Sequence, residues 1–152
     1  MLKVENSIEI SKPVENVWDY LTDFGNTPKW DIGVLETKQT SEGTPGLGTT
    51  FVNVGPFLGQ KTTRREYKVT EYERNKKVTV LLITPSKYIQ NAEVSYIFEP
   101  TPNGTKLTYT GYVDFVGILK LIQPLLQQRA RKDGNGDLDN LKHLLEAQTD
   151  NV

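Results

Sequence analysis

The chain has 152 residues, a formal net charge of −1 and ordinary shares of apolar and charged residues, so it can form one domain with a substantial core. Its near-zero charge gives no overall field that would attract nucleic acid, and we predict no nucleic-acid partner. Disulfides and thiol chemistry are excluded because there is no cysteine. The start, MLKVENSIEI, lacks the features of a signal peptide, and no window reaches the ~18 apolar residues of a membrane span. We therefore expect a cytoplasmic protein without integral membrane association.

The first segment alternates in polarity and then becomes helical. Apolar residues of one parity, with polar residues between them, predict a half-buried strand at Leu2, Val4, Ile8 and Ile10. The period changes in SKPVENVWDYLTD, where we expect Ser11 to cap a helix and Pro13 to occupy its first turn. The segment NTPKW has the same pattern, which predicts a second short helix that Thr27 caps and Trp30 closes.

From Ile32 onward the chain is rich in Val, Thr, Tyr and Phe, which favours strands. Turn signals such as SEGTPGLG, GPFLG, ERNKK and TPNG separate the runs. Successive runs with short connections predict an antiparallel meander. The expected strands cover residues 34–41, 49–54, 61–72, 78–84, 88–98 and 105–115.

After Gly117 the helical period returns and continues to about Ala147. A helix of about 27 residues is about 40 Å long, comparable to strands of about ten to twelve residues. The predicted fold class is therefore α+β: a curved seven-stranded antiparallel sheet wrapped around a long C-terminal helix, with two short helices after the first strand. One helix cannot fill the concave side of such a sheet, so we expect an apolar cavity between them.

The segment KDGNGD within this helix has two interpretations. Asp133, Asn135 and Asp137 alternate like the first ligands of a calcium loop, but that loop needs Gly at its sixth position and Glu at its twelfth. Leu138 and Leu144 stand there instead. At about 100° per residue, an apolar stripe runs straight through the glycines. Its members are Leu126, Ala130, Gly134, Asp137, Leu138, Leu141, Leu144 and Leu145. We therefore predict a helix with a weakened turn and no metal site.

Several segments resemble one known family: IEISKPVENVWDYLTDFGNTPKW, Gly48-Thr49 at the start of a strand, YKVTEYERNKKV, SYIFEPTPNGTKLTYT and DLDNLKHLLE. They are similar to the polyketide cyclase/dehydrase and lipid-transport branch of the START-like, helix-grip superfamily, also called SRPBCC. The resemblance covers nearly the whole chain and implies a single START-like ligand-binding domain over residues 1–152, with a cavity for small, mostly apolar ligands. It does not choose among the cyclases, transport proteins, chaperone activators and quinone-binding proteins that share this fold.

Strand parity predicts which side chains face the cavity. An apolar wall with several phenols, one amide and a guanidinium has the composition of a ligand pocket. For Tyr67, Tyr96 and Tyr109, ligand contact and simple packing are equal alternatives, whereas Trp18 is assigned to the core. Arg65 is either an anchor for an acidic head group or a solvated strand charge. The candidate ligand-binding residues are Trp30, Phe51, Arg65, Tyr67, Tyr88, Gln90, Tyr96, Phe98, Tyr109, Leu126, Ala130 and Gly134.

No catalytic constellation is visible in the sequence. The only histidine, His143, falls about 160° from the centre of the apolar stripe, which argues against a Ser-His-Asp or His-metal mechanism. Carboxylates such as Asp19, Asp23, Glu71 and Glu73 are expected on solvated faces, and nothing pairs them as acid and base. We therefore assign no catalytic residue and predict no cofactor.

Two functional hypotheses of different classes follow. The first is binding or transport of a small hydrophobic ligand, such as a lipid, an isoprenoid or a polyketide-like compound, and it is favoured because no acid/base pair is visible. The second is a cofactor-free cyclase or dehydratase in which Tyr96, Tyr109 or Arg65 would polarise a carbonyl. Binding of an unidentified protein partner through exposed loops such as GPFLG is a third alternative. We also expect Gly134 to roof the cavity and act as a hinge, with a tolerated irregularity as the alternative.

Overall fold

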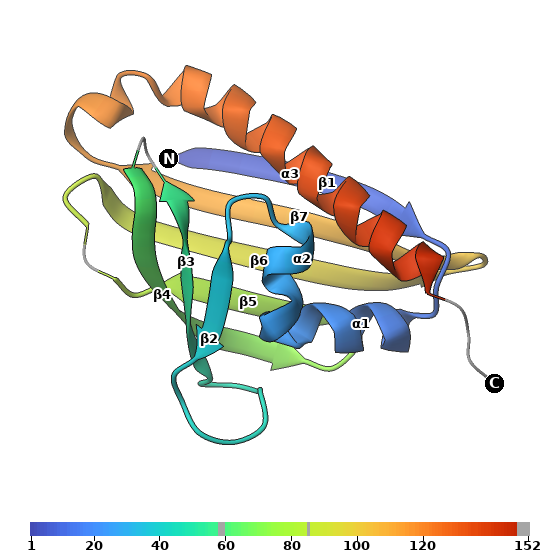
Figure 1. Cartoon of the computed structure of the whole chain (residues 1–152). Helices are drawn as coiled ribbons and strands as arrows, with labels where there is room; N and C mark the ends of the chain where they lie inside the picture. Colours follow the sequence, from blue (N-terminus) through green and yellow to red (C-terminus); the bar gives the residue numbers. More distant parts are fainter. Residues whose placement is uncertain (58–59, 85, 149–152) are drawn as a thin grey trace.

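The computed structural model describes residues 1–57, 60–84 and 86–148, so Leu58 and Gly59 of the GPFLG segment lie outside the described residues. One antiparallel sheet of seven strands has the order β1-β7-β6-β5-β4-β3-β2, and the long helix α3 lies against one face of it (Figure 1). The predicted α+β fold class is confirmed. The strands are β1 (Leu2–Ile10), β2 (Glu36–Gln39), β3 (Thr50–Phe57), β4 (Gln60–Glu73), β5 (Lys77–Leu82), β6 (Ile89–Thr101) and β7 (Gly104–Phe115). The helices are α1 (Val14–Thr22), α2 (Thr27–Trp30) and α3 (Gln123–Ala147), with short 3-10 helices η1 (Phe24–Asn26) and η2 (Gly117–Lys120).

The two short helices begin differently from the sequence prediction. Helix α1 has Pro13 at its N-cap position and no side-chain cap, so the assignment of Ser11 as a cap is wrong. The backbone N–H of Ser11 instead donates to Oε2 of Glu146 near the end of α3, at 3.0 Å. Thr27 already lies inside α2, where Asn26 holds the N-cap position without a side-chain hydrogen bond. At α1, Pro13 therefore lies one position before the predicted first turn, and its carbonyl accepts the N–H groups of Asn16 and Val17 at 3.0 and 3.3 Å. Pro13 itself has no N–H that would need a partner.

Trp18 of α1 is the centre of the core and is fully buried, as predicted. Its ring meets the rings of Tyr72 and Phe98 edge to face, with both centroid separations 5.0 Å. Edge-to-face pairs of this kind add about 0.5–1.5 kcal/mol beyond the burial of apolar area. The core therefore lies where α1 and the C-terminal part of α3 cover the sheet.

Helix α3 runs without a break through Gly134 and Gly136, which confirms the helical interpretation of KDGNGD. It begins at Gln123 rather than directly after Gly117, because η2 precedes it. The part of α3 up to Asp137, called its N-terminal half below, packs differently from the part that begins at Leu138, called its C-terminal half. Leu138, Leu141 and Leu145 in the C-terminal half are at most 2% exposed. In the N-terminal half the residues facing the sheet are only half-buried, namely Leu126, Ala130, Gly134 and Asp137.

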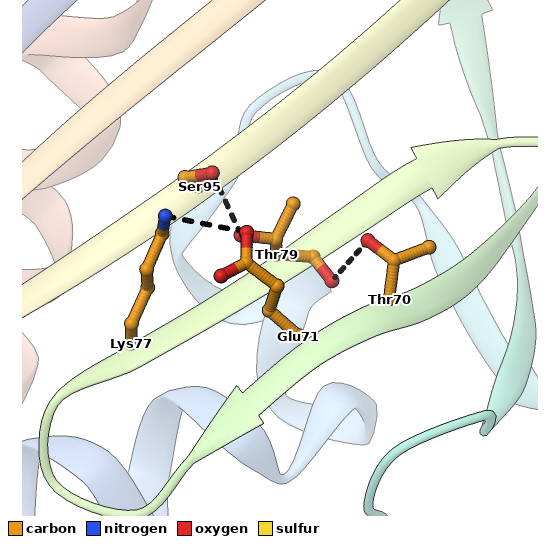
Figure 2. Close-up of polar contacts among 5 residues, drawn as sticks. All are labelled: Thr70, Glu71, Lys77, Thr79 and Ser95. Carbon is orange, nitrogen blue, oxygen red and sulfur yellow. Dashed lines mark hydrogen bonds and ion pairs between the residues drawn. The ribbon is translucent and has the colours of Figure 1, made fainter.

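The outer face of β4, β5 and β6 carries a polar network beside a β-bulge (Figure 2). The carboxylate of Glu71 forms an ion pair with Lys77 at 3.2 Å and accepts a hydrogen bond from Oγ1 of Thr79 at 3.1 Å. Thr79 Oγ1 also lies 2.8 Å from the Ser95 hydroxyl, and Thr70 donates to the Thr79 carbonyl at 3.5 Å. This network satisfies the polar groups that the bulge displaces, while the apolar residues on either side of the bulge stay in the core.

Candidate functional site

The inner face of the sheet is closed at one end and open at the other. At the end next to α1, the inward side chains Val78, Phe98 and Leu107 are at most 3% exposed. Further along the same sheet, towards the N-terminal half of α3, inward apolar and aromatic side chains are only half-buried. They are Val94, Tyr96, Tyr109 and Val113. We call this part of the inner face the open end, because its side chains keep partial exposure although Val94, Tyr96 and Tyr109 pack against the core.

Three tyrosines from three strands gather at the open end. The rings of Tyr96 and Tyr109 have centroids 5.5 Å apart, and Trp30 meets Tyr96 edge-on at 6.1 Å. Tyr67 stacks on Phe51 at 5.5 Å and is close enough to Tyr96 and Tyr109 to raise the pKa of both. We refer to Tyr67, Tyr96 and Tyr109 as the phenol cluster, and Trp30 lies at its edge.

The phenol cluster consists of protonated hydroxyls with free hydrogen-bonding capacity. Burial raises the pKa of Tyr67, Tyr96 and Tyr109 above the ordinary 10.0, so all three remain neutral at physiological pH. In the part of the chain that the structure describes, neither the Tyr96 nor the Tyr109 hydroxyl has a hydrogen-bond partner. The buried indole Nε1 of Trp30 also has none. A buried donor without a partner, such as this indole N–H, is unusual in a protein interior and needs an explanation.

Two aspartates from distant parts of the sequence meet beside the phenol cluster, and both are half-buried. Oδ1 of Asp31 accepts the Gly33 N–H at 2.9 Å, and Oδ1 of Asp137 accepts the Ile32 N–H at 3.0 Å. Burial raises the pKa of Asp31, although the Gly33 N–H and the Arg65 guanidinium oppose the rise. For Asp137, burial and then the charge of Asp31 raise the pKa to about 7.

The two aspartate side chains also share a hydrogen bond, which lowers the pKa of Asp31 and raises that of Asp137. Two carboxyl groups in contact titrate as a pair, because ionising the second one places like charges side by side. The pair therefore holds one proton near neutral pH and presents a carboxylic acid next to a carboxylate. This is the arrangement that general acid–base chemistry requires.

Arg65 acts on the acid pair and also lines a pocket whose wall contains no member of the phenol cluster. Its Nη2 donates to the Gly33 carbonyl at 3.0 Å, and its guanidinium lies 4.7 Å from the Phe57 ring centroid. The buried Nε of Arg65 has no hydrogen-bond partner. The pocket has a volume of about 230 Å³, and its wall contains Arg65 of β4, Leu82 of β5 and Tyr88.

The structure brings together about half of the residues predicted from the sequence. Trp30, Tyr67, Tyr96 and Tyr109 lie together, and a Cβ added at Gly134 would meet Tyr109 at 3.6 Å. The remaining predicted residues have other places. Arg65 and Tyr88 line the pocket, Phe51 stacks between Phe24 and Tyr67, Phe98 packs on Trp18, Gln90 is exposed, and Leu126 and Ala130 are half-buried on α3.

The acid pair is the feature that the sequence did not reveal. Asp137 was placed on the inward stripe of α3, and an aspartate on an apolar stripe is itself a signal that a partner faces it. Nothing marked Asp31 as that partner, because it follows a short helix and pairs only through the fold. The exposure of Gln90 has a similar cause, since a register shift between Ile89 and Asn91 interrupts the alternation at the start of β6.

Three further findings concern the residues that the structure describes. None of the helices in the described part of the chain is both long and apolar enough to span a membrane. Among residues 1–57, 60–84 and 86–148, no group of three or more His, Cys, Asp or Glu side chains is arranged to hold a metal ion. His143 is exposed on α3, on the side away from the sheet, as the stripe predicted.

The sequence profile of the family described as "Polyketide cyclase / dehydrase and lipid transport" matches residues 1–146. The chain belongs to this family. Because the match covers nearly the whole chain, it confirms the family resemblance that the sequence motifs indicated. No curated protein sequence is detectably similar to the chain.

Solved structures share the fold of this family member at low sequence identity. A START superfamily protein from Mycobacterium smegmatis has a TM-score of 0.79 and 15% identity, covering 98% of this chain and 100% of that one. The ZhuI aromatase/cyclase from Streptomyces sp. R1128 has a TM-score of 0.79 and 11% identity, covering 95% and 93%. The di-domain ARO/CYC StfQ of the steffimycin biosynthetic pathway has a TM-score of 0.78 and 15% identity, covering 95% of this chain. The present chain spans about half (50%) of the length of StfQ.

Proposed function

We propose that the protein binds one small, mainly apolar molecule that carries a polar group. The apolar body lies between the sheet and the N-terminal half of α3, and the polar group meets the phenol cluster. The observation that supports this proposal is the open end itself, where aromatic side chains remain half-buried and donors remain unpaired. A family of polyketide cyclases and lipid-transport proteins handles ligands of this kind.

The residues of α3 provide the space for such a ligand. Ala130 and Gly134 face the sheet where the next turn of the same stripe has Leu138. The small side chain of Ala130 occupies less volume than leucine would, whereas the position of Gly134 is already taken up by Asn6 of β1. Ligand pockets are apolar cavities with a few oriented polar groups. The phenol cluster supplies these polar groups, and the ring of one member, Tyr109, lies beside Gly134.

The proposal is tested with Nile red, a neutral dye whose fluorescence rises in apolar surroundings. The folded protein should bind it with a stoichiometry near one. Ala130→Phe should reduce the affinity at least tenfold, because the ring fills the space opposite the sheet. Gln128→Phe is the matched control, since Gln128 is exposed on the opposite side of α3. Equal binding by both variants, or no binding by the folded wild type, would remove the proposal.

A second candidate function is a cofactor-free dehydration or cyclisation, and the acid pair is the observation that favours it. In a β-hydroxyketone, the Asp31 carboxylate would remove a proton from the carbon between the two oxygen-bearing carbons. The Asp137 carboxylic acid would protonate the departing hydroxyl, which leaves as water. A phenol O–H would stabilise the negative charge that develops on the ketone oxygen.

This candidate is tested with 3-hydroxy-1-tetralone, which loses one water and tautomerises to fluorescent 1-naphthol. The wild type should accelerate this reaction over buffer, and Asp31→Asn should abolish the acceleration by removing the base. Asp139→Asn, an exposed position on the same helix, should keep it. If the wild type binds Nile red but does not accelerate the reaction, the proposal of ligand binding stands and the proposal of catalysed dehydration is wrong.

A further inference from the structure

The polar groups that border the open end are mostly hydrogen-bond donors. The indole Nε1 of Trp30 can only donate, and it is buried without a partner. The hydroxyls of Tyr96 and Tyr109 are neutral and unpaired among the described residues. Trp18 also has an unpaired indole nitrogen, but its ring is fully buried in the closed core, out of reach of a ligand. A ligand at the open end therefore meets donors that lack acceptors.

The fixed charges around these donors are predominantly negative. Asp31 and Asp137 form the acid pair, and Asp133 lies close enough on α3 to raise the pKa of both. Asp133 has an ion pair with Arg129 at 3.5 Å, but the Arg129 side chain is 80% exposed and the pair is screened by solvent. Arg65 is the cation that faces the acid pair. An anion placed beside the phenol cluster would thus lie next to carboxylates in a region with restricted solvent.

The position of Arg65 also argues against its use as an anchor for an acidic head group. Its Nη2 already donates to the Gly33 carbonyl, and its charge is balanced by Asp31. The buried Nε–H has no partner among the described residues. A carboxylate usually binds arginine through two parallel hydrogen bonds, and the bond from Nη2 to Gly33 uses one of the N–H groups that such a contact needs.

We infer that the open end selects neutral molecules whose polar group accepts hydrogen bonds, such as a ketone or quinone carbonyl on an aromatic or isoprenoid skeleton, and rejects carboxylates. This inference rests on the proposed ligand-binding function and names the class of ligand. The carbonyl oxygen accepts hydrogen bonds from Trp30, Tyr96 or Tyr109, and no charge has to approach Asp31 and Asp137. A fatty acid, by contrast, brings an anion to the acid pair.

Three naphthalenes that differ only in one substituent separate these classes. 2-Acetylnaphthalene presents a neutral acceptor, 2-naphthoate an anion, and 2-ethylnaphthalene no polar group. Equilibrium dialysis against the wild-type protein at pH 8 should give a Kd for the ketone at least tenfold lower than for either of the others. Naphthoate binding as tightly as the ketone would overturn the charge argument. A ketone that binds no better than 2-ethylnaphthalene would overturn the donor argument.

Variants assign the selectivity to named residues. Tyr96→Phe and Tyr109→Phe should each lower the ratio of ketone to ethylnaphthalene affinity by about threefold to tenfold, the range expected for one hydrogen bond. Asp137→Asn should raise the ratio of naphthoate to ketone affinity severalfold, because asparagine has the size and shape of aspartate but carries no negative charge. Asp139→Asn is the control and should leave both ratios unchanged, since Asp139 is exposed on the far side of α3. Equal changes in Asp137→Asn and Asp139→Asn would contradict the inference.

The outcomes for the two proposals are distinguishable. If Nile red and all three naphthalenes fail to bind the folded protein, the ligand-binding function itself is wrong. If Nile red binds with a stoichiometry near one but naphthoate equals or exceeds the ketone, ligand binding stands and only the selectivity for neutral acceptors is wrong.

Discussion

Replacing Asp137 by asparagine should stabilise the protein at pH 8 and remove part of its pH dependence. Burial and the neighbouring Asp31 carboxylate raise the pKa of Asp137 from 3.8 to about 7. The folded protein therefore holds a proton that the unfolded chain releases between these two values. The stabilising contribution of this proton is fully present below about pH 4 and is lost as the pH rises through 7. Asparagine has no charge to develop, so the variant should not show this loss.

The size of the effect follows from the pKa difference. At 1.36 kcal/mol per pKa unit, the difference between 3.8 and about 7 corresponds to about 4 kcal/mol. The carboxyl is only half-buried, and solvent screening reduces this to about 1–2 kcal/mol. The asparagine oxygen can still accept the Ile32 N–H that Asp137 accepts at 3.0 Å, so no hydrogen bond is lost. Asp137→Asn should therefore be about 1–2 kcal/mol more stable than wild type at pH 8 and close to it at pH 5.

Urea unfolding at pH 5, 6, 7 and 8 measures this directly. The quantity to follow is the difference in unfolding free energy between variant and wild type, because other carboxylates affect both proteins equally. Asp139→Asn, at an exposed position two residues along α3, controls for the loss of a negative charge on the helix. If the difference for Asp137→Asn is the same at all four pH values, or equals that for Asp139→Asn, the acid pair does not share a proton as described.

Two matched pairs on α3 test the packing of its halves, again by urea unfolding. Gly136→Ala should stabilise by up to about 1 kcal/mol, because a Cβ there meets nothing within 4 Å. Gly134→Ala should give no such gain, because its Cβ would collide with Nδ2 of Asn6; a gain equal to that of Gly136→Ala would contradict this contact. Leu138→Ala should destabilise by about 2–5 kcal/mol, since Leu138 is 2% exposed. Leu126→Ala should cost about 1 kcal/mol or less, and a loss as large as that of Leu138→Ala would show that the open end is closely packed.

The fold was predictable because its signals are local and periodic. Alternation gave the strands to within a few residues at each end, and the stripe through Gly134 correctly extended α3 across a sequence that looks like a calcium loop. The predictions that Ser11 and Thr27 cap the two short helices were wrong, and the reason is also local. Pro13 starts α1 without a cap, and the chain before α2 is already helical, so the side-chain hydrogen bonds that define capping are not needed.

The candidate site was predictable only where it follows strand parity. Tyr96 and Tyr109 lie on the inner face because their strands keep regular alternation through these positions, where the two residues are paired. The alternation of inward and outward side chains fails at the bulge beside Gln90, and no residue type in that segment predicts a bulge. The pairing of Asp31 with Asp137 depends on how α2 and α3 dock, and that contact is a product of the whole sheet rather than of any local pattern.

The contrast between the two halves of α3 supports a binding role without reference to family. In the C-terminal half, the stripe consists of leucines that are at most 2% exposed. In the N-terminal half, the same stripe has a glycine, which costs about 1 kcal/mol in a helix, and an aspartate whose carboxyl meets another carboxyl. At Gly134 the glycine is required by the close approach of Asn6, whereas the aspartate at position 137 has no such packing reason. The less buried, more polar packing of the N-terminal half is what the proposed ligand-binding role would require of this surface.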